Sequence, residues 1–257
     1  MKKKIVAIGG GENGRLLENG IYTSYETGSI DKEIIRLTEK EKPNFLFINH
    51  AMKSLEIQDS YYQTMKKIYG EKFNCNCMDL KSNELFDVKK VKEKLDWADI
   101  IYEGGGDTRI MIALWKKTGF DKLLYQAWNK GKVICGISAG AVCWFKSCNS
   151  YNEINNTFEK IEGLVWINLH LTPHCDEKGR YASSKKQLKE SSLIGVMLSN
   201  CAALEIVDNM YKLIVCKSNI GQIGYGIKAH WNNNKYKEEK IIISNKFENI
   251  ERLLNTN

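Results

Sequence analysis

The sequence predicts an α/β protein whose mostly parallel sheet is covered by helices on both faces. Four short apolar runs end in glycine or small polar residues, and they alternate with amphipathic segments long enough for helices. Such alternation requires crossover connections, which generate a parallel sheet between two layers of helices. The expected strands are 4–8, 44–48, 100–102 and 133–135, and the expected helices are 30–40, 60–69, 88–97 and 108–118.

The second half of the chain has a different pattern, with polar and charged stretches between shorter apolar runs. We expect a loop at 149–156 and a helix within 176–190. Further strands are expected at 164–167, 169–171, 202–207, 211–216 and 241–243. No linker or internal repeat divides the chain, so we expect one domain over residues 1–257.

The composition excludes several classes of protein. The chain has 257 residues and a net charge of +7, and its lysines are spread among acidic residues. Nucleic-acid binding requires basic residues clustered on one face, so we expect no such partner. No apolar run is long enough for a membrane span, and 5–8 is too short for a signal peptide, which predicts a cytoplasmic protein without membrane association. The eight cysteines lie mostly in apolar runs, which favours buried, reduced thiols over disulfides or zinc ligands.

A Gly-x-Ser-x-Gly motif centred on Ser138 follows the apolar run 133–135 and precedes a helix-compatible segment. This context is typical of a nucleophile elbow, a turn so sharp that the flanking positions must lack bulk. Gly136 and Gly140 meet that requirement. The N–H of Ala139 would then lie at the start of a helix, where it can stabilise a developing oxyanion.

A serine nucleophile requires a base, and the chain contains four histidines. His174 is the preferred base because it ends an apolar run and follows Pro173, which restricts the backbone. We expect His170 to pack inside, His50 to line a pocket at the end of the second strand, and His230 to be exposed. The spacing of His170 and His174 could hold a metal, but no third ligand is evident, so no metal is expected.

Asp208 is the preferred acid to orient the base, because it lies where two strand-like runs meet. The same position has a purely structural explanation, since Asp-Asn is a favourable hairpin turn. Glu205 is the main alternative, and Asp176 and Glu177 are less favoured because they lie in a charged stretch close to His174. The resulting order of serine, histidine and acid differs from that of α/β-hydrolases.

The turn from Glu103 to Thr108 contains three consecutive glycines, which allow a ligand to approach the backbone closely. It lacks the Lys-Ser/Thr pair of a P-loop, so a contribution to an oxyanion hole is favoured over a phosphate cradle. A tight strand-to-helix turn without a chemical role is the structural alternative.

The order and spacing of three motifs resemble the serine peptidases of family S51. The motifs are Gly-Gly-Gly-Asp-Thr at 104–108, Gly-Ile-Ser-Ala-Gly-Ala at 136–141 and Pro-His-Cys-Asp-Glu-Lys-Gly-Arg at 173–180. This is the dipeptidase E group, which is related to cyanophycinase and to class I glutamine amidotransferase-like folds. The resemblance extends from residue 4 to about 216, and it implies a flavodoxin-like, three-layer α/β/α domain.

The resemblance implies a catalytic triad of Ser138, His174 and Asp208, although dipeptidase E has a glutamate where Asp208 stands. It also implies an oxyanion hole formed by the N–H groups of Gly106 and Ala139. The residues expected beside the substrate are Gly105, Asp107, Thr108 and Arg109.

One departure from the family pattern concerns the substrate, because the family usually has asparagine where this chain has Asp107. An added carboxylate near the pocket disfavours an acidic substrate side chain unless Arg109 or Arg180 offsets it. We therefore expect a serine-type dipeptidase or exopeptidase that acts on small peptides through an acyl-enzyme, requires no cofactor, and is a monomer or homodimer. The alternatives are an amidase or esterase on a non-peptide acyl substrate, and a non-catalytic amidotransferase-like binding protein, in which the elbow would carry cysteine.

Overall fold

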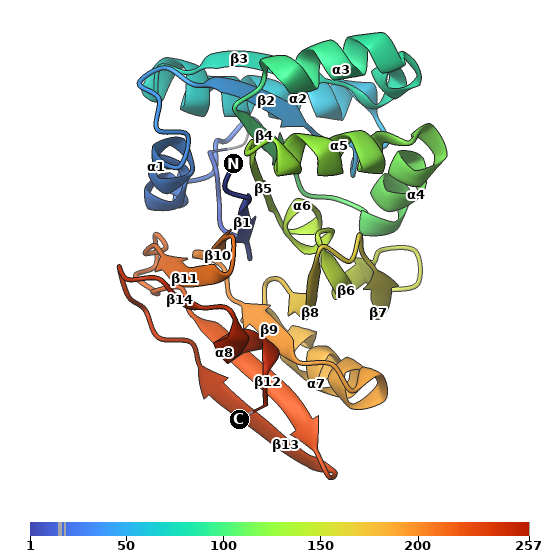
Figure 1. Ribbon diagram of the computed structural model, residues 1–257, viewed down its shortest axis with the longest axis vertical. Coiled ribbons are helices and arrows are strands. Elements are labelled where there is room, and N and C mark those ends of the chain that lie inside the picture. Colours follow the sequence, from blue (N-terminus) through green and yellow to red (C-terminus); the bar gives the residue numbers. More distant parts are fainter. Residues whose placement is uncertain (15–16, 18, 257) are drawn as a thin grey trace.

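The computed structural model describes residues 1–14, 17 and 19–256, and this part of the chain builds a sheet of eight strands and a sheet of six (Figure 1). Five neighbouring strands of the larger sheet are parallel. In sheet order they are β1 (Lys4–Ile8), β5 (Val133–Ile137), β4 (Ile100–Glu103), β2 (Asn44–Ile48) and β3 (Asn76–Leu80). The larger sheet is therefore mostly parallel, as predicted.

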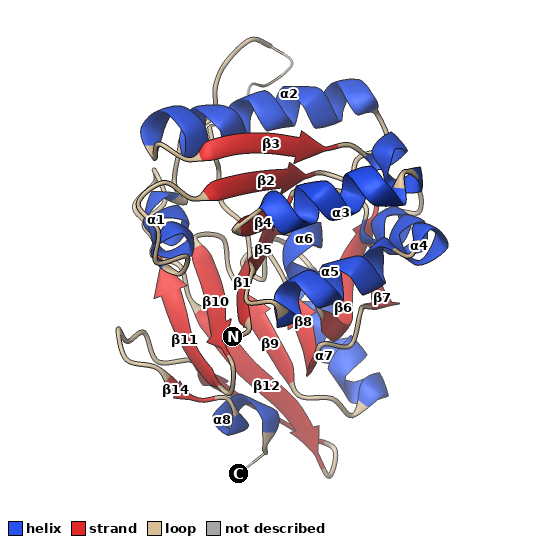
Figure 2. Ribbon diagram, turned by 45° about the horizontal axis from the view of Figure 1, so that its top comes forward, coloured by secondary structure: helices blue, strands red, loops and turns tan. Residues whose placement is uncertain are grey.

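Helices cover both faces of the parallel strands, which Figure 2 shows from a second direction. One face carries α1 (Gly28–Arg36) and α2 (Leu55–Lys66), which continues into a π-helical turn, η1 (Lys67–Lys72). The other face carries α3 (Val88–Trp97), α4 (Thr108–Thr118) and α5 (Phe120–Asn129), with a short 3₁₀ turn, η2 (Ser82–Phe86), before α3. The helices predicted at 88–97 and 108–118 have these bounds, and the three-layer α/β/α arrangement is confirmed.

Each parallel strand contributes to two apolar cores, because successive side chains point to opposite faces of the sheet. In β1, Val6 and Ile8 belong to the cluster that contains Ile30 of α1. Ile5 lies in the other cluster, together with Trp115 of α4. A strand buried on both faces needs a continuous apolar run rather than an alternating one, which is why the sequence pattern identified these strands.

Three antiparallel strands extend the larger sheet beyond β1. They are β10 (Ala202–Val207), β11 (Met210–Val215) and β14 (Glu248–Asn249). β10 runs against β1, so that Ala203 lies beside Ile8 at the carboxyl end of β1 and Val207 lies beside Lys4 at its start. The two ends of β10 therefore reach opposite edges of the sheet.

The six-stranded sheet lies beyond the elbow and mixes parallel and antiparallel pairs. Its order is β13 (Lys235–Lys240), β12 (Gly226–Asn232), β9 (Gly195–Leu198), β8 (Ile167–Thr172), β6 (Phe145–Asn152) and β7 (Thr157–Glu162). Three helices accompany it along the chain: α6 (Ala139–Val142), α7 (Arg180–Ser191) and α8 (Glu251–Leu254). Phe145, Leu169 and Leu171 share one apolar cluster with Ile134 of the central sheet, so the two sheets have a common core. A single domain over 1–257 stays a prediction.

The smaller sheet contains the main errors of the sequence-based prediction. The polar segment 149–156, expected as a loop, forms the end of β6 and the turn that follows it. In the strand part of this segment Asn149, Ser150 and Asn152 are buried, with polar partners such as Gln187 for Asn149, so apolar alternation could not reveal the strand. The run 164–167 joins a strand only at Ile167, and 241–243 is not a strand.

The helices and the cysteines of the described chain bear on two further expectations, a membrane span and disulfide bonds. None of the described helices is long and apolar enough to cross a bilayer. All eight cysteines are free thiols, and six of them are buried.

Candidate active site

Ser138 lies at the turn between β5 and α6, at the carboxyl end of β5, which has β1 and β4 as its neighbours in the sheet. Its backbone has φ 56° and ψ −113°, a conformation that costs a non-glycine residue on the order of 1–3 kcal/mol. The N–H of Ser138 donates to the carbonyl oxygen of Ile8 at 3.0 Å, which ties the turn to β1. The local sequence therefore forms the sharp strand-to-helix turn that Gly-x-Ser-x-Gly predicts.

The two glycines of the motif are required by close backbone contacts. A Cβ atom on Gly136 would lie 2.5 Å from the carbonyl oxygen of Gly140, and a Cβ atom on Gly140 would collide with the carbonyl group of Glu103. Any larger residue at either position would push the elbow away from β4. The turn therefore keeps Ser138 beside the glycine-rich loop that follows β4.

His174 lies next to Ser138, although the two residues come from different sheets. Its Nε2 is 2.9 Å from Oγ of Ser138, and its backbone N–H donates to the carbonyl oxygen of Gly9 at 3.1 Å. Burial lowers the pKa of His174 below its usual value, and the nearby carboxylate of Glu177 partly opposes this shift. The imidazole is therefore neutral near pH 7, as a proton acceptor must be.

Asn200, a residue that the sequence analysis missed, lies on the other side of the imidazole. Its Oδ1 is 2.7 Å from Nδ1 of His174. Asp176 accepts two hydrogen bonds from Asn200, one from the backbone N–H at 2.8 Å and one from Nδ2 at 3.3 Å. Because the amide oxygen accepts from Nδ1, the Nε2 lone pair faces the serine hydroxyl.

Asp208 is not the partner of His174, which corrects the predicted triad. It occupies the turn between β10 and β11, where its Oδ1 accepts from the N–H of Lys3 at 2.8 Å. Asn200 precedes β10 and Asp208 follows it, and a strand of six residues spans about 20 Å. Asp208 therefore lies at the edge of the sheet opposite to the one that carries Ser138 and His174.

Glu205, the alternative acid, does not contact His174 either. Its side chain is fully buried in the middle of β10, 3.2 Å from Nζ of Lys212. Burial and the neighbouring carboxylate of Glu33 raise the pKa of Glu205 to about 7, although Lys212 opposes this shift. The acids that do approach the imidazole are Asp176, through Asn200, and Glu177, whose Oε1 is 3.3 Å from Nδ1. Their place in the Pro-His-Cys-Asp-Glu motif was the available signal.

The glycine-rich loop supplies backbone donors beside Ser138. A Cβ atom on Gly105 would lie 3.5 Å from Cβ of Ser138, so this residue faces Ser138. Gly106 has φ 143°, a region open to glycine, and a Cβ atom there would lie 2.5 Å from the carbonyl oxygen of Ala51. Within the described chain, the N–H groups of Gly105, Gly106 and Ala139 have no hydrogen-bond acceptor. These donors can therefore bind an oxyanion.

A buried carboxyl group holds this loop from beneath. Glu103 is fully buried, its Oε1 accepts from the N–H of Ala51 at 3.2 Å, and its Oε2 has no hydrogen-bond partner among the described residues. Burial raises the pKa of Glu103 well above its usual value, which favours the neutral carboxylic acid over the carboxylate. Ala51 in turn accepts from the N–H of Asp107 at 2.9 Å, which links the carboxyl group to both ends of the glycine turn.

Asp107 and Arg109 do not line the cavity beside Ser138. Asp107 caps α4 by accepting from the N–H groups of Arg109 at 2.9 Å and Ile110 at 3.4 Å. The guanidinium of Arg109 pairs with Asp107 at 3.0 Å and with Glu159 at 2.8 Å. Partial burial raises the pKa of Asp107, but hydrogen bonds from Arg109 outweigh it and lower the pKa overall. Asp107 was predicted to bring a negative charge into the pocket, but it lies outside the cavity and pairs there with Arg109. Thr108 does line the cavity.

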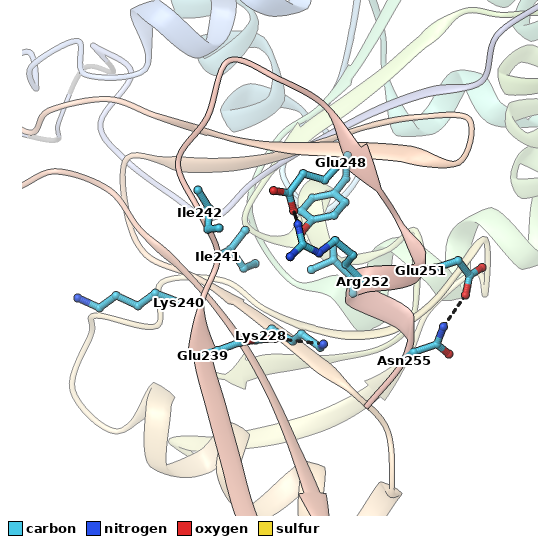
Figure 3. A pocket seen from close by; sticks show the side chains of 11 residues that line it. Lys228, Glu239, Lys240, Ile241, Ile242, Glu248, Glu251, Arg252 and Asn255 are labelled. Atoms are coloured by element: carbon cyan, nitrogen blue, oxygen red, sulfur yellow. Dashed lines mark hydrogen bonds and ion pairs between the residues drawn. The ribbon is translucent and has the colours of Figure 1, made fainter. Parts of the chain in front are cut away.

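The cavity that contains Ser138 and His174 has a volume of about 590 Å³. Its walls come from loops that are distant in sequence, including 11–13, 149–151 and 218–222. A second cavity of about 420 Å³ lies between α8 and β12 (Figure 3). Lys228 pairs there with Glu239 at 3.1 Å, and Arg252 pairs with Glu248 at 3.0 Å. The cavity contains no serine, cysteine or histidine among its described residues.

Two of the remaining histidines, His50 and His170, have structural partners. His50 is buried, with Nε2 2.7 Å from the carbonyl oxygen of Leu80 and Nδ1 2.9 Å from Nε1 of Trp115. His170 is buried, with Nδ1 2.9 Å from Oγ of Ser147. His230 is buried in β12 rather than exposed as expected. In the described ranges, no group of three or more acidic, histidine or cysteine side chains could hold a metal ion.

The sequence profile of peptidase family S51 matches residues 19–214. The chain belongs to this family. An uncharacterised peptidase of Bacillus subtilis (strain 168), YgaJ, is 28% identical over 220 residues, which cover 84% of this chain and 89% of YgaJ.

Two crystal structures have the same fold. The structure of a peptidase from an acI-B1 Actinobacterium superposes with a TM-score of 0.70 at 16% identity and covers 97% of both chains. The structure of a putative peptidase E protein from Listeria monocytogenes EGD-e superposes with a TM-score of 0.60 at 17% identity, covering 84% of this chain and 99% of its own. The S51 assignment and these folds agree with a peptidase.

Proposed function

We propose that this S51 protein is a serine-type peptidase that hydrolyses short peptides through Ser138, His174 and Asn200. The observation that carries the proposal is the continuous contact from Oγ of Ser138 to Nε2 of His174, at 2.9 Å, and from Nδ1 to Oδ1 of Asn200, at 2.7 Å. A hydroxyl, an imidazole and an acceptor that orients the imidazole are the three parts that acyl transfer by serine requires. Asn200 takes the place that we assigned to an acid.

In the first step, His174 accepts the proton of Ser138 through Nε2 as Oγ attacks the peptide carbonyl. Asn200 fixes the Nδ1–H tautomer, and Asp176 fixes Asn200. The imidazolium that forms is stabilised by the carboxylate of Glu177, 3.3 Å from Nδ1. The pair of acids therefore supplies the negative charge that a carboxylate supplies in an ordinary triad.

The oxyanion of the tetrahedral intermediate would be bound by N–H groups of Gly106 and Ala139, with Gly105 beside them. Collapse of the intermediate releases the amine, which takes the proton from His174, and leaves an acyl group on Ser138. Water, activated by the same imidazole, then releases the acyl group.

The size of the cavity supports a short substrate. A volume of about 590 Å³ suits a small ligand and does not suit an extended chain. We therefore propose a dipeptidase or another exopeptidase rather than an enzyme that cuts within folded or long chains.

The test is turnover of a dipeptide panel by the unsubstituted protein and by Ser138→Ala, together with labelling by a fluorophosphonate probe. Ser138→Ala should lower kcat by at least about 10⁴-fold and abolish labelling, because the nucleophile is removed. Ser218→Ala is a matched control, since Ser218 lines the same cavity without contacting His174. Retained hydrolysis in Ser138→Ala rejects the proposal, and turnover of esters but of no peptide would assign the site to an esterase instead.

A further inference from the structure

The wall of the catalytic cavity carries an excess of negative charge. Among the described residues that line it, five are acidic and one, Arg180, is basic. The acidic residues are Glu12, Glu26, Glu153, Asp176 and Glu177. The pKa of His174 is lowered, so the imidazole does not offset them at neutral pH.

Two of these carboxylates and the guanidinium already interact with the catalytic group or with each other. Asp176 is bound to Asn200. A carboxylate oxygen of Glu177 lies 3.8 Å from Nε of Arg180. The guanidinium of Arg180 packs over the ring of Phe158, with Cζ 5.0 Å from the ring centroid. A carboxylate on the substrate would have to compete with Glu177 for this guanidinium.

Glu26 presents a fixed negative charge to the cavity. Its Oε2 accepts from the N–H of Glu12 at 3.0 Å, and its Oε1 accepts from the N–H of Asn219 at 2.8 Å. Burial by itself raises the pKa of Glu26, but these backbone hydrogen bonds outweigh it and lower the pKa. The carboxylate is therefore ionised and held in one position before a ligand enters.

Glu153 adds a second negative charge from another wall of the cavity. It lies in the turn between β6 and β7, is exposed to solvent, and pairs with no basic side chain in the described part of the chain. A free amino terminus on a peptide would balance one of the two charges, on Glu26 or on Glu153. The other charge remains for a second cationic group.

We propose that this cavity selects peptides with a basic side chain beside the scissile bond, and that Glu26 and Glu153 determine this preference. The inference rests on the proposed function, since it names the substrate class of the same site. An aspartyl or glutamyl peptide would bring another negative charge into a cavity in which the one basic side chain among the described lining residues, Arg180, is already paired with Glu177. Such a peptide is disfavoured for that reason.

The experiment measures equilibrium binding of Lys-Ala, Ala-Ala and Asp-Ala to the Ser138→Ala protein by calorimetry. Lys-Ala should bind roughly tenfold more tightly than Ala-Ala, and Asp-Ala should bind most weakly, with the differences shrinking at about 0.5 M salt as screening increases. Equal affinities, no binding of any peptide, or tightest binding of Asp-Ala would overturn the inference.

This readout separates the inference from the proposed function, because Ser138→Ala cannot turn over the peptides. If the three peptides bind with the predicted ranking of affinities but the unsubstituted protein hydrolyses none of them, the peptidase is rejected and the charge selectivity is kept. Hydrolysis of all three peptides at equal kcat/KM, with equal binding, rejects the selectivity and keeps the peptidase.

The residues are tested in the same Ser138→Ala background. Glu153→Lys and Glu26→Gln should each lower the ratio of Lys-Ala affinity to Asp-Ala affinity, by about tenfold and about threefold, since the first changes the charge by two units and the second by one. Glu162→Lys is the matched control, because Glu162 is exposed on β7 and lies outside the cavity. An unchanged ratio in both cavity variants, with normal thermal unfolding, overturns the assignment to these residues.

Discussion

His50 and His174 each follow a strand, and burial lowers the pKa of both. Their partners differ. The ring nitrogens of His50 contact the carbonyl oxygen of Leu80 and the indole N–H of Trp115, both in the core. The ring nitrogens of His174 contact the hydroxyl of Ser138 and the amide of Asn200 at a cavity wall.

The comparison shows that a position at the end of a strand does not by itself make a histidine a base. His50 has no lone pair facing a reactant, because its Nδ1 already accepts from Trp115 and its Nε2–H donates to Leu80. His174 keeps its Nε2 lone pair for a group that can give up a proton. The partners of the ring, rather than its depth of burial, separate the structural histidine from the one that we propose as the base.

The largest expected effect separates these two residues directly. His174→Ala should lower kcat on a cleaved dipeptide by about 10³–10⁴-fold, because the proton acceptor is lost. His50→Ala should leave kcat within a few-fold, but lower the free energy of unfolding by about 2–4 kcal/mol, because Trp115 and Leu80 lose their partner in the core. Initial rates and urea unfolding curves measure both quantities, and a His50→Ala protein that is stable but inactive would contradict the contrast.

A smaller effect is expected at the group that orients the base. Asn200→Ala should lower kcat by about 10–100-fold with little change in KM, because the imidazole loses the acceptor that fixes its tautomer. Asp208→Asn, in the turn between β10 and β11, should change kcat by less than about twofold. Steady-state kinetics on one dipeptide compare the two, and a greater loss in Asp208→Asn would restore the triad predicted from the sequence.

The smallest expected effect concerns pH. His174 must be neutral to accept a proton, and its lowered pKa predicts that kcat/KM falls to half its maximum below pH 6.5. Glu177 opposes the lowering, so Glu177→Gln should move this midpoint further down, by roughly 0.5 pH unit. Glu162→Gln serves as the control, and an upward shift in Glu177→Gln would contradict the role assigned to that carboxylate.

The parts of the fold predicted well are those in which local pattern and tertiary environment agree. Strands 4–8 and 44–48 were recognised because burial on both faces requires unbroken apolar runs. In the smaller sheet the run 169–171 was recognised within β8, but the end of β6 was missed because Asn149 and Ser150 are buried against polar partners from α7 and α4. The partners that bury these β6 side chains lie far away along the chain, so the local sequence pattern does not show them.

The sequence by itself brought forward Ser138 and His174, because the elbow needs Gly136 and Gly140 within a few residues and because Pro173 precedes the base. It could not select Asn200 over Asp208, since both flank the same strand. Only the tertiary structure decided between them: β10 runs antiparallel to β1, so its first end meets the imidazole and its last end meets Lys3. The charge of the cavity has the same origin, because Glu26 and Glu153 line one cavity with Ser138 only where loops from the two sheets converge.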